Sequence, residues 1–504
     1  MSSDAVASTG AGTSSKWLIL GTATFCTILY AMAVTIASVA LPDMRGAMSA
    51  TQDQITWTIT GNIVATAVAT PLAGWFAGRY EVRPILLVSV IGFILSTLAC
   101  GMAQTLEQLV VARVAQGAFG APLVPLAQAI VLAVFPASQR SLSMSVWSMG
   151  AILGPIIAPT LGGYLGEHFG WRWIFFLMVP FGGVALGCIM LFIPKLKLGE
   201  SKPLDWTGFL ALAVAMAALQ IMFDRGERNG WFDSMETVIE ASIAALGFYL
   251  FVAQCVTAKR PFLDIGIFKD RNYTLGLFLV FFFGMLNFVP MVLFPPLLQE
   301  LRGYPQSIIG LLMGSRGFGT FIGFTLMAFA GRVDPRIPMT VGFFLQGYAG
   351  WVMAGFGINL TTWDVAWTSA LQGFGVGLCW VPVTVVAFST LNPKLIPEAT
   401  ALFQLLRNLA SSMFISISVA VVLRTGTIAY AESAADLNVW AEGLRHITSQ
   451  TVWDIETLRG LAGLSSELQR QSLMIGYINA FKMFAITSFL AIPLIFLLKV
   501  GKRG

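Results

Sequence analysis

An arginine lies in the middle of a long apolar stretch of this chain. Arg113 belongs to the segment LEQLVVARVAQGAFGAPLVPLAQAIVLAVF (106–135), which is long and apolar enough to cross a membrane as a helix. An arginine at the centre of such a helix costs about 2.5–3.5 kcal/mol to insert, so it normally faces a wet cavity or a polar partner. We therefore expect Arg113 to serve transport. The alternative is a packing arginine satisfied by backbone carbonyls.

The composition predicts many such helices. Of 504 residues, 56% are hydrophobic and 11% are charged, more apolar surface than a soluble core absorbs. Hydropathy predicts an all-α integral membrane protein with fourteen transmembrane helices. The predicted spans lie near 17–41, 55–77, 84–103, 108–134, 142–165, 173–193, 206–223, 238–257, 273–295, 307–330, 339–358, 365–390, 399–423 and 475–498.

Patterns for catalysis and metal binding are missing from the sequence. There is no HExxH or P-loop pattern, the two histidines (His168 and His446) lie outside the predicted spans, and the five cysteines fall in apolar segments without CxxC spacing. We therefore expect no enzyme activity, no catalytic residue, no metal site and no cofactor.

Lys and Arg residues orient the predicted spans. The polar segment 1–16 leads into an apolar run without a signal-peptidase site, so it is expected to be a cytoplasmic tail before a retained span. An even number of spans places both termini on one side of the membrane, and the loops on that side carry most of the Lys and Arg. Both termini are predicted to be cytoplasmic. The net charge of +5 follows from these loops and requires no nucleic-acid partner.

The chain also repeats itself. AGRYEVR (77–83) recurs as AGRVDPR (330–336) at an offset of 253 residues, and QGAFG (116–120) has a counterpart in QGFG (372–375) at an offset of 256. Transporters are often built from internal repeats in this way. We expect an N-terminal six-helix bundle (17–193), an inserted helix pair (206–257) and a C-terminal six-helix bundle (273–498). The C-terminal bundle is expected to contain a long periplasmic loop (424–474). Ser369 takes the place of Arg113 in the second copy, so this arginine belongs to one half only.

These features together resemble the fourteen-span drug/proton antiporter branch of the major facilitator superfamily, closest to the EmrB-type multidrug efflux permeases. Leu109-x3-Arg113-x2-Gln116-Gly117 resembles the family's span-four motif, and GPIIAPTLGG (154–163) resembles its span-five antiporter motif. The segments 219–232 and 262–276 resemble the EmrB type around the inserted spans. The match covers essentially the full length and implies the major facilitator fold.

The resemblance assigns roles to several groups of residues. The transport or cavity positions are Arg113, Gln116, Gly117, Arg316, Arg407 and Asn408, and the antiporter motif comprises Gly154, Pro155, Ala158, Pro159, Gly162 and Gly163. Small residues four apart also serve ordinary helix packing. The gating loops contain Arg79, Glu81 and Arg83 in one half and Arg332, Asp334 and Arg336 in the other. We expect these loops to tie adjacent helix ends through charge pairs, with Glu81 as a partner.

Proton coupling is where this chain departs from its relatives. Ala33 stands where they carry an aspartate in span one, and no carboxylate lies deep in a predicted span. The remaining candidates for proton coupling are Asp53, Asp224 and Glu398 at the rims, although acidic residues also suit solvated helix ends. Alternatively, an acidic substrate could carry its own proton. The cations within the spans are Arg113, Arg316, Arg407 and Lys482, which disfavours lipophilic dications and suits neutral or weakly acidic amphipaths.

The resemblance implies an inner-membrane exporter of amphipathic drugs or toxic compounds. It would work by alternating access, with the proton gradient as driving force, in a tripartite system with a periplasmic adaptor (membrane-fusion protein) and an outer-membrane channel. Apolar residues at near-helical spacing in 424–474 form a candidate docking surface; a helix lying on the membrane or capping the bundle is the alternative. Two other functions stay open: an exporter or facilitator of a specific lipophilic acid without a fixed proton site, and a membrane receptor or scaffold.

Overall fold

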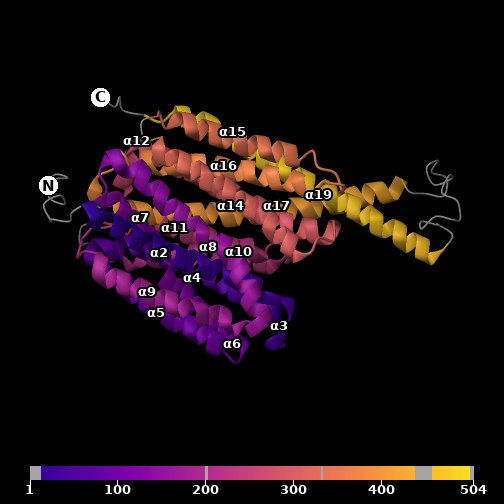
Figure 1. The fold of residues 1–504 in the computed structure, drawn as a ribbon, viewed down its shortest axis with the longest axis horizontal. Coiled ribbons are helices and arrows are strands. Elements are labelled where there is room, and N and C mark those ends of the chain that lie inside the picture. Colours follow the sequence, from indigo (N-terminus) through magenta and orange to yellow (C-terminus); the bar gives the residue numbers. More distant parts are fainter. Residues whose placement is uncertain (1–12, 199–202, 331–332, 437–456, 500–504) are drawn as a thin grey trace.

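The structure is a computed structural model that describes residues 13–198, 203–330, 333–436 and 457–499. Within these residues the regular elements are helices, most of which run side by side along the long axis of the molecule (Figure 1). The prediction of an all-α protein is therefore confirmed for the described part of the chain.

The helices fall into three consecutive groups. The first contains α2 (Thr13–Val39), α3 (Leu41–Ala47), α4 (Gln52–Arg79), α5 (Val82–Met102), α6 (Leu106–Gly120), α7 (Leu123–Val134), α8 (Arg140–Phe169) and α9 (Arg172–Phe192). The second contains α10 (Trp206–Arg225) and α11 (Met235–Thr257). The third contains α12 (Arg271–Asn287), α13 (Val289–Pro296), α14 (Gln306–Phe329), α15 (Arg336–Met353), α16 (Thr362–Ala387), α17 (Ile396–Asp436) and α19 (Leu458–Phe496). We refer to the first and third groups as the N-terminal and C-terminal bundles.

Thirteen of the fourteen predicted spans correspond to candidate membrane spans of the described chain, although not every boundary agrees. Thirteen segments of the described chain are long and apolar enough to cross a membrane. The predicted span 339–358 corresponds to α15, which is not among the thirteen but packs between α16 and α19 as a further helix of the C-terminal bundle. The predicted span 108–134 is divided between α6 and α7. The break falls at Ala121 and Pro122, where proline lacks the amide hydrogen that would continue the helix.

Threonine caps mark equivalent helix starts in the two bundles. Thr105 accepts a hydrogen bond from the Gln108 amide (3.3 Å) at the start of α6, and Thr361 accepts one from the Asp364 amide (3.3 Å) at the start of α16. Such caps satisfy backbone donors that a helix start leaves unpaired. The two threonines are 256 residues apart, the same offset as the repeated QG pair, so the internal repeat extends to the way in which these helices begin.

The inserted pair α10 and α11 lies over the seam between the bundles (Figure 1). Helix α10 contacts α4 of the N-terminal bundle and α17 of the C-terminal bundle. Ala67, Leu212, Met216 and Leu405 form a separate buried cluster where these three helices meet. The insertion therefore packs against both halves instead of extending either one.

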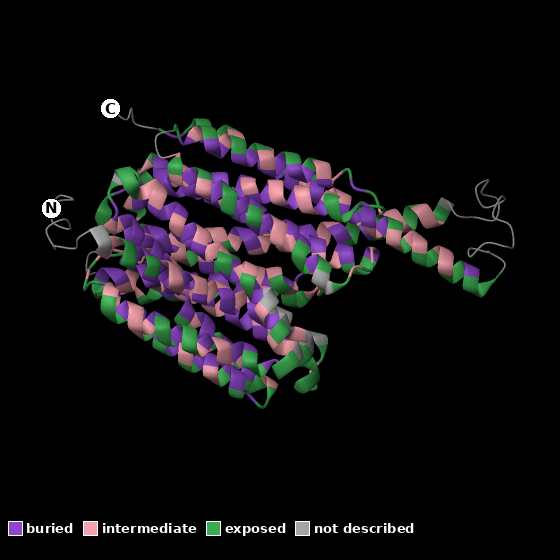
Figure 2. Cartoon of the chain, in the orientation of Figure 1, coloured by how far each residue is buried: buried purple, intermediate pink, exposed green. Residues whose placement is uncertain are grey.

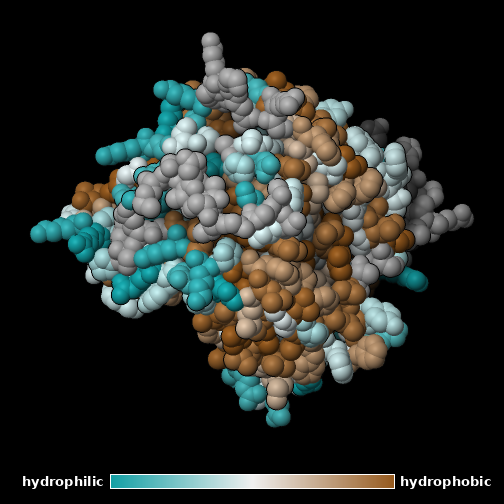
Figure 3. Space-filling model, turned by 60° about the vertical axis from the view of Figure 1, so that its left-hand side comes forward, coloured by the Kyte–Doolittle hydropathy of each residue, from teal (hydrophilic) through white to brown (hydrophobic). Residues whose placement is uncertain are grey.

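The surface of the helices is apolar. Buried residues lie along the inner faces of the helices (Figure 2), and apolar residues cover much of the face shown in Figure 3. Large apolar side chains with high exposure include Phe329 (83%), Leu311 (78%) and Leu191 (77%). An exposed apolar surface of this extent is typical of a membrane interaction.

The prediction of a long loop over 424–474 is wrong at both of its ends. Helix α17 continues to Asp436 and α19 begins at Leu458, so the last two spans are 41 and 39 residues long. The two helices stay in contact along their extensions, where Gly426 faces the backbone of Ser472 and the Tyr430 and Ser465 hydroxyls are 3.0 Å apart. They project beyond the other helices (Figure 1). Residues 437–456, which hold most of the predicted amphipathic face, lie outside the described residues.

Candidate functional site

Arg113 is buried inside the N-terminal bundle and is fully engaged there. Its side chain is 2% exposed. The Nε atom donates to the Thr58 carbonyl oxygen of α4 (3.1 Å), Nη1 donates to Gln116 Oε1, and the guanidinium lies 6.0 Å from the centre of the Phe175 ring. Gln116 Nε2 in turn donates to Thr97 Oγ1 of α5 (2.7 Å). Arg113 thus connects α4, α5 and α6, which is the arrangement that the packing alternative describes; its role in transport stays a prediction.

The C-terminal bundle contains an equivalent polar network with a different source of charge. Arg316 of α14 is 7% exposed. Its Nε atom donates to Gln372 Oε1 of α16 (2.8 Å), and Nη2 donates to Asn287 Oδ1 (2.8 Å) and to the Asn287 carbonyl. Ser369, at the position of Arg113 in the repeat, is buried without a hydrogen-bond partner for its hydroxyl. In both halves an arginine therefore donates a hydrogen bond to the repeated glutamine, although the arginine belongs to α6 in one half and to α14 in the other.

Two glycines of the repeat bring helices into close contact. A Cβ atom on Gly117 would collide with the carbonyl oxygen of Asn62 in α4, and a Cβ atom on Gly373 would collide with the carbonyl oxygen of Arg316 in α14. Asn62 and Arg316 are themselves 254 residues apart. Both bundles therefore use the same backbone approach, which explains why glycine follows the repeated glutamine.

Arg407 and Asn408 lie on α17, where it faces the N-terminal bundle. Arg407 Nη2 donates to Asn408 Oδ1 (3.0 Å), and the guanidinium lies 5.2 Å from the centre of the Trp380 ring. Leu405, two residues earlier on α17, packs with Ala67 of α4 in the buried cluster described above. This cation therefore lies at the interface between the bundles, whereas Arg113 and Arg316 lie inside them and Lys482 of α19 is exposed.

Sequence reasoning missed a polar contact across this interface. Gln404 Nε2 of α17 donates to Gln128 Oε1 of α7, and both side chains are at most 1% exposed. Gln128 Nε2 and Gln404 Oε1 have no hydrogen-bond partner. The sequence did contain a signal for Gln404, because this residue precedes Arg407 by one helical turn and so lies on the same face of the helix. The partner helix could not be inferred from that spacing.

The small-residue face of the antiporter motif packs within its own bundle. Gly154 lies against the backbone of Ile28 and Met32 in α2, and a Cβ atom on Gly162 would approach the Ile36 side chain of α2 within 2.8 Å. Ala158 is buried, and Pro155 is partly buried in the same helix. The side chains of Pro159 and the position of Gly163 lie outside the part whose burial is described. Close packing of α8 on α2 is thus evident, and an antiport role stays a prediction.

Helix α8 also touches the opposite bundle. A Cβ atom on Gly317 of α14 would collide with the side chain of Ile156. Nearer the end where α2 begins and α19 finishes, the Ser141 hydroxyl donates to the Met327 carbonyl (2.8 Å). The contacts place α8 and α14 side by side across the bundle interface.

The two gating loops bind helix ends, but through carbonyl groups. Arg83 Nη2 donates to the Met190 carbonyl at the end of α9, and Arg336 Nη2 donates to the Leu498 carbonyl just after α19. Carbonyls at a helix C-terminus carry partial negative charge, so an arginine is a suitable partner. Helices α9 and α19 are the last helices of their bundles, which makes the two contacts equivalent.

The expected charge pair through Glu81 is not formed with any described residue. The Glu81 side chain is exposed at the position before α5. Arg79 instead stacks on Trp75 (5.7 Å) and Tyr80 (5.9 Å). Asp334 Oδ1 accepts from the Arg336 amide (3.0 Å), and Arg332 lies outside the described residues.

The three rim carboxylates differ in their surroundings. Thr60 Oγ1 of α4 donates to Asp224 Oδ2 at the end of α10. Glu398 lines a small pocket with Pro71 and Trp75 of α4, Phe251 of α11 and Leu405 of α17. The side chain of Asp53 lies outside the part that the structure describes. Asp224 thus lies beside the start of α4 and Glu398 beside its end, so the two carboxylates lie toward opposite ends of this helix.

This arrangement defines a membrane transporter of two related helical bundles with a polar interface between them. Residues 23–415 match the family model described as Major Facilitator Superfamily. The chain therefore belongs to the major facilitator superfamily, in agreement with the predicted family and fold. Its relatives in this superfamily are transporters and not enzymes, which agrees with the expectation from the missing catalytic patterns.

Several relatives are similar over nearly the whole chain. The multidrug export protein EmrB of Escherichia coli (strain K12) is 32% identical over 472 residues, which cover 93% of this chain and 92% of that protein. The fatty acid resistance protein FarB of Neisseria gonorrhoeae is 29% identical, with 96% and 95% covered. Multidrug resistance protein Stp of Mycobacterium tuberculosis (strain CDC 1551 / Oshkosh) is 30% identical, with 75% and 70% covered.

Solved structures show the same fold at low sequence identity. A double tryptophan mutant of XylE has a TM-score of 0.65 at 12% identity and covers 97% of each chain. The human organic anion transporter MFSD10 has a TM-score of 0.63 at 16% identity, with 95% of this chain and 99% of that chain covered. The chain is thus a multi-pass membrane protein with the major facilitator fold.

Proposed function

We propose that this chain exports amphipathic drugs or toxic compounds across the inner membrane by alternating access. The single observation that carries the proposal is the polar interface between the two bundles, where Gln404 of one half donates to Gln128 of the other and Arg407 lies one helical turn after Gln404. Polar side chains at such an interface would contact a substrate in the centre of the membrane. The identity of 32% to a multidrug export protein over 93% of the chain supports drugs as the cargo.

We further propose that both termini are cytoplasmic. Helix α2 begins and α19 ends at the same end of the molecule (Figure 1). The loops at this end carry Arg83, Arg140 and Arg336, as expected of a cytoplasmic side. The projecting ends of α17 and α19 would then lie in the periplasm.

The α17 and α19 extensions support a tripartite assembly. Helices of 41 and 39 residues are about twice as long as a span of about 20 residues. At about 1.5 Å per residue, their ends extend well past the hydrocarbon layer. We propose that this hairpin contacts a periplasmic adaptor, which in turn would engage an outer-membrane channel.

The coupling to protons is proposed through a rim carboxylate. Asp224 contacts Thr60 near the start of α4, and Glu398 lines a pocket with Pro71 and Trp75 near the end of α4. A proton bound at either carboxylate would be sensitive to how the inserted pair and the bundles sit against each other. Asp53 stays a third candidate from the sequence.

An exporter or facilitator of lipophilic acids is the second candidate function. The described spans contain the buried cations Arg113 and Arg316 and the interfacial cation Arg407. The similarity to a fatty acid resistance protein also favours acidic amphipaths. Such a substrate would not require a proton site on the protein.

The test is efflux from reconstituted vesicles with neutral, acidic and cationic lipophilic dyes. The pH gradient and the membrane potential are imposed separately, so that each driving force is isolated. Uphill efflux of neutral or acidic dyes that follows the pH gradient is the expected result. Downhill flux alone would mean that the chain is a facilitator, and no flux of any dye would contradict export.

A further inference from the structure

Arg407 is half-buried and differs from the buried Arg113 and Arg316 in how its hydrogen-bond donors are used. Arg113 and Arg316 each place Nε and a terminal nitrogen on oxygen acceptors inside their own bundle. Arg407 Nη2 reaches Asn408, but Nε is buried without a hydrogen-bond partner. A buried donor of a charged group that stays unpaired costs free energy, so its persistence calls for an explanation.

No protein carboxylate neutralises this cation among the described residues. The ion pairs in this part of the chain are Arg225 with Glu236 and Arg470 with Glu467. Arg407 lies one helical turn after Gln404, which reaches Gln128 of the opposite bundle. A cation without an anion, placed between two bundles that move during transport, is suited to bind an anion from outside the protein.

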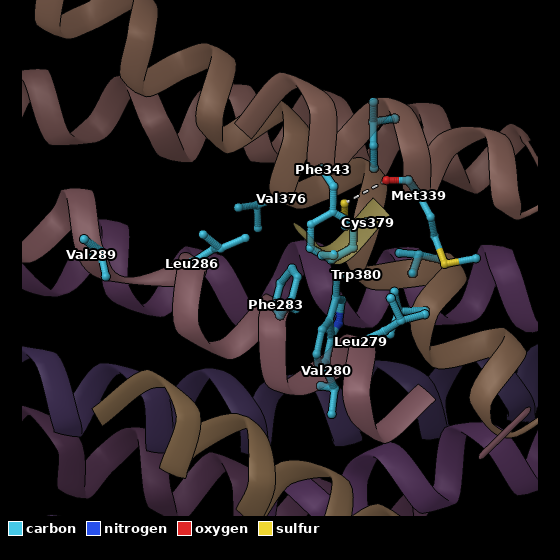
Figure 4. Close-up of a cluster of buried hydrophobic side chains, with 14 of the residues drawn as sticks. Leu279, Val280, Phe283, Leu286, Val289, Met339, Phe343, Val376, Cys379 and Trp380 are labelled. Carbon is cyan, nitrogen blue, oxygen red and sulfur yellow. Dashed lines mark hydrogen bonds between the residues drawn. The ribbon is translucent and has the colours of Figure 1, made fainter. Parts of the chain in front are cut away.

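Aromatic rings hold the guanidinium in a defined orientation. Trp380 lies 5.2 Å from Arg407 and is itself packed against Phe283 (5.0 Å) and Phe403 (5.8 Å). Figure 4 shows Phe283 and Trp380 in contact within the buried cluster of the C-terminal bundle. A ring on one face of the guanidinium leaves the edge that carries the N–H donors for hydrogen bonding. This edge matches a planar anion with two oxygens, such as a carboxylate.

We propose that Arg407 binds the carboxylate of an acidic amphipathic substrate at the interface between the bundles. The inference rests on the proposed export function and names a substrate class for the same site. Nε and the terminal nitrogens would donate to the two carboxylate oxygens. Trp380 would lie against the acid group, and Gln128 of the opposite bundle meets α17 one helical turn away, so bound substrate would lie between the two halves.

Binding of a fluorescent acid and its uncharged ester separates this proposal from general hydrophobic binding. The purified full-length protein in lipid nanodiscs is titrated with dansyl-labelled undecanoic acid and with its methyl ester, and binding to empty nanodiscs is subtracted. We expect the wild type to bind the acid more tightly than the ester. Arg407→Gln should weaken acid binding by about tenfold or more and leave ester binding within about twofold, because only the charged contact is removed.

Two further variants serve as controls. Lys482→Gln removes an exposed cation of α19 and should bind both ligands like the wild type. Arg407→Lys keeps the charge but lacks the two-pronged geometry, so it should lose part of the acid binding. This variant also serves if Arg407→Gln does not fold.

The proposal would be overturned if the wild type bound the acid no better than the ester. It would also be overturned if Arg407→Gln weakened binding of the acid and the ester equally, or if the folded Arg407 variants bound the acid as tightly as the wild type. Efflux of a neutral dye by the same wild-type preparation, measured in vesicles, tests export independently. Neutral-dye efflux by a protein that does not prefer the acid over the ester would reject the carboxylate site only. Absence of neutral-dye efflux would reject the proposed function.

Discussion

Gln116 and Gln372 occupy equivalent positions in the two bundles, and each accepts a hydrogen bond from an arginine. Arg113 lies one turn before Gln116 on the same helix, whereas Arg316 reaches Gln372 from the neighbouring helix α14. The two halves therefore share the glutamine that accepts the hydrogen bond and the glycine that follows it. The sequence interpretation that this arginine belongs to one half holds for its position in the repeat, but both bundles contain an arginine in this network.

Removing Arg113 should destabilise the N-terminal bundle. Arg113→Ala deletes hydrogen bonds to the Thr58 carbonyl and to Gln116 in a buried site. We expect a loss of about 1.5–3 kcal/mol in the free energy of unfolding, together with loss of efflux. Thermal unfolding in detergent, followed by size-exclusion chromatography, measures the change, with Lys482→Ala as a control for an exposed charge. An unchanged melting temperature would show that this network does not hold α4 and α6 together.

Alanine at either repeated glycine should force helices apart. Gly117→Ala and Gly373→Ala each place a methyl group against a backbone carbonyl, which cannot move aside as a side chain can. We expect both variants to have lower melting temperatures and reduced transport, by a cost of about 1–3 kcal/mol for overpacking. Gly21→Ala is the matched control, because nothing lies within 4 Å of the added carbon. Similar melting of all three variants would contradict the close approach.

The Gln128 and Gln404 side chains should be energetically coupled across the bundle interface. Each single alanine variant leaves one buried amide without its partner. The losses of unfolding free energy in the two single variants should therefore add up to more than the loss in the double variant, in which neither amide remains. A double-mutant cycle on melting and on efflux tests this, with a coupling of about 0.5–1.5 kcal/mol expected. Strict additivity of the two substitutions would mean that the contact contributes nothing.

Substitutions at Thr60 and Asp224 should distinguish proton coupling from structural bridging. Asp224→Asn keeps the shape of the side chain but cannot carry a proton, and Thr60→Val removes the donor to it. If Asp224 carries the proton, Asp224→Asn loses uphill efflux driven by the pH gradient, whereas Thr60→Val retains it. The vesicle assay measures both. Equal efflux by Asp224→Asn and the wild type would leave Glu398 and Asp53 as candidates.

Much of the fold could be predicted because its signals are local. Long apolar segments report spans directly, since a helix satisfies its own backbone groups in the membrane. The boundaries of α17 and α19 were harder to infer because their extensions pack against each other. Hydropathy detects burial in lipid but does not detect pairing between two helices.

The candidate site was predicted only in part. Arg113, Arg316 and Arg407 stand out in the sequence as charges within apolar spans, but their sequence context does not distinguish them. The contacts that separate them come from other helices: Thr58 for Arg113, Asn287 for Arg316, and Trp380 for Arg407.

The amino-acid sequence by itself determined the class of protein, the approximate positions of most spans, the repeat and the identity of the intramembrane cations. Each of these follows from composition or from spacing along one helix. Only the tertiary structure decided which cations are engaged inside a bundle and which one faces the other bundle. It also decided that α10 spans the seam between the halves. Helix packing brings together residues hundreds of positions apart, such as Gln128 and Gln404, and periodicity within one helix does not specify the helix that will lie beside it.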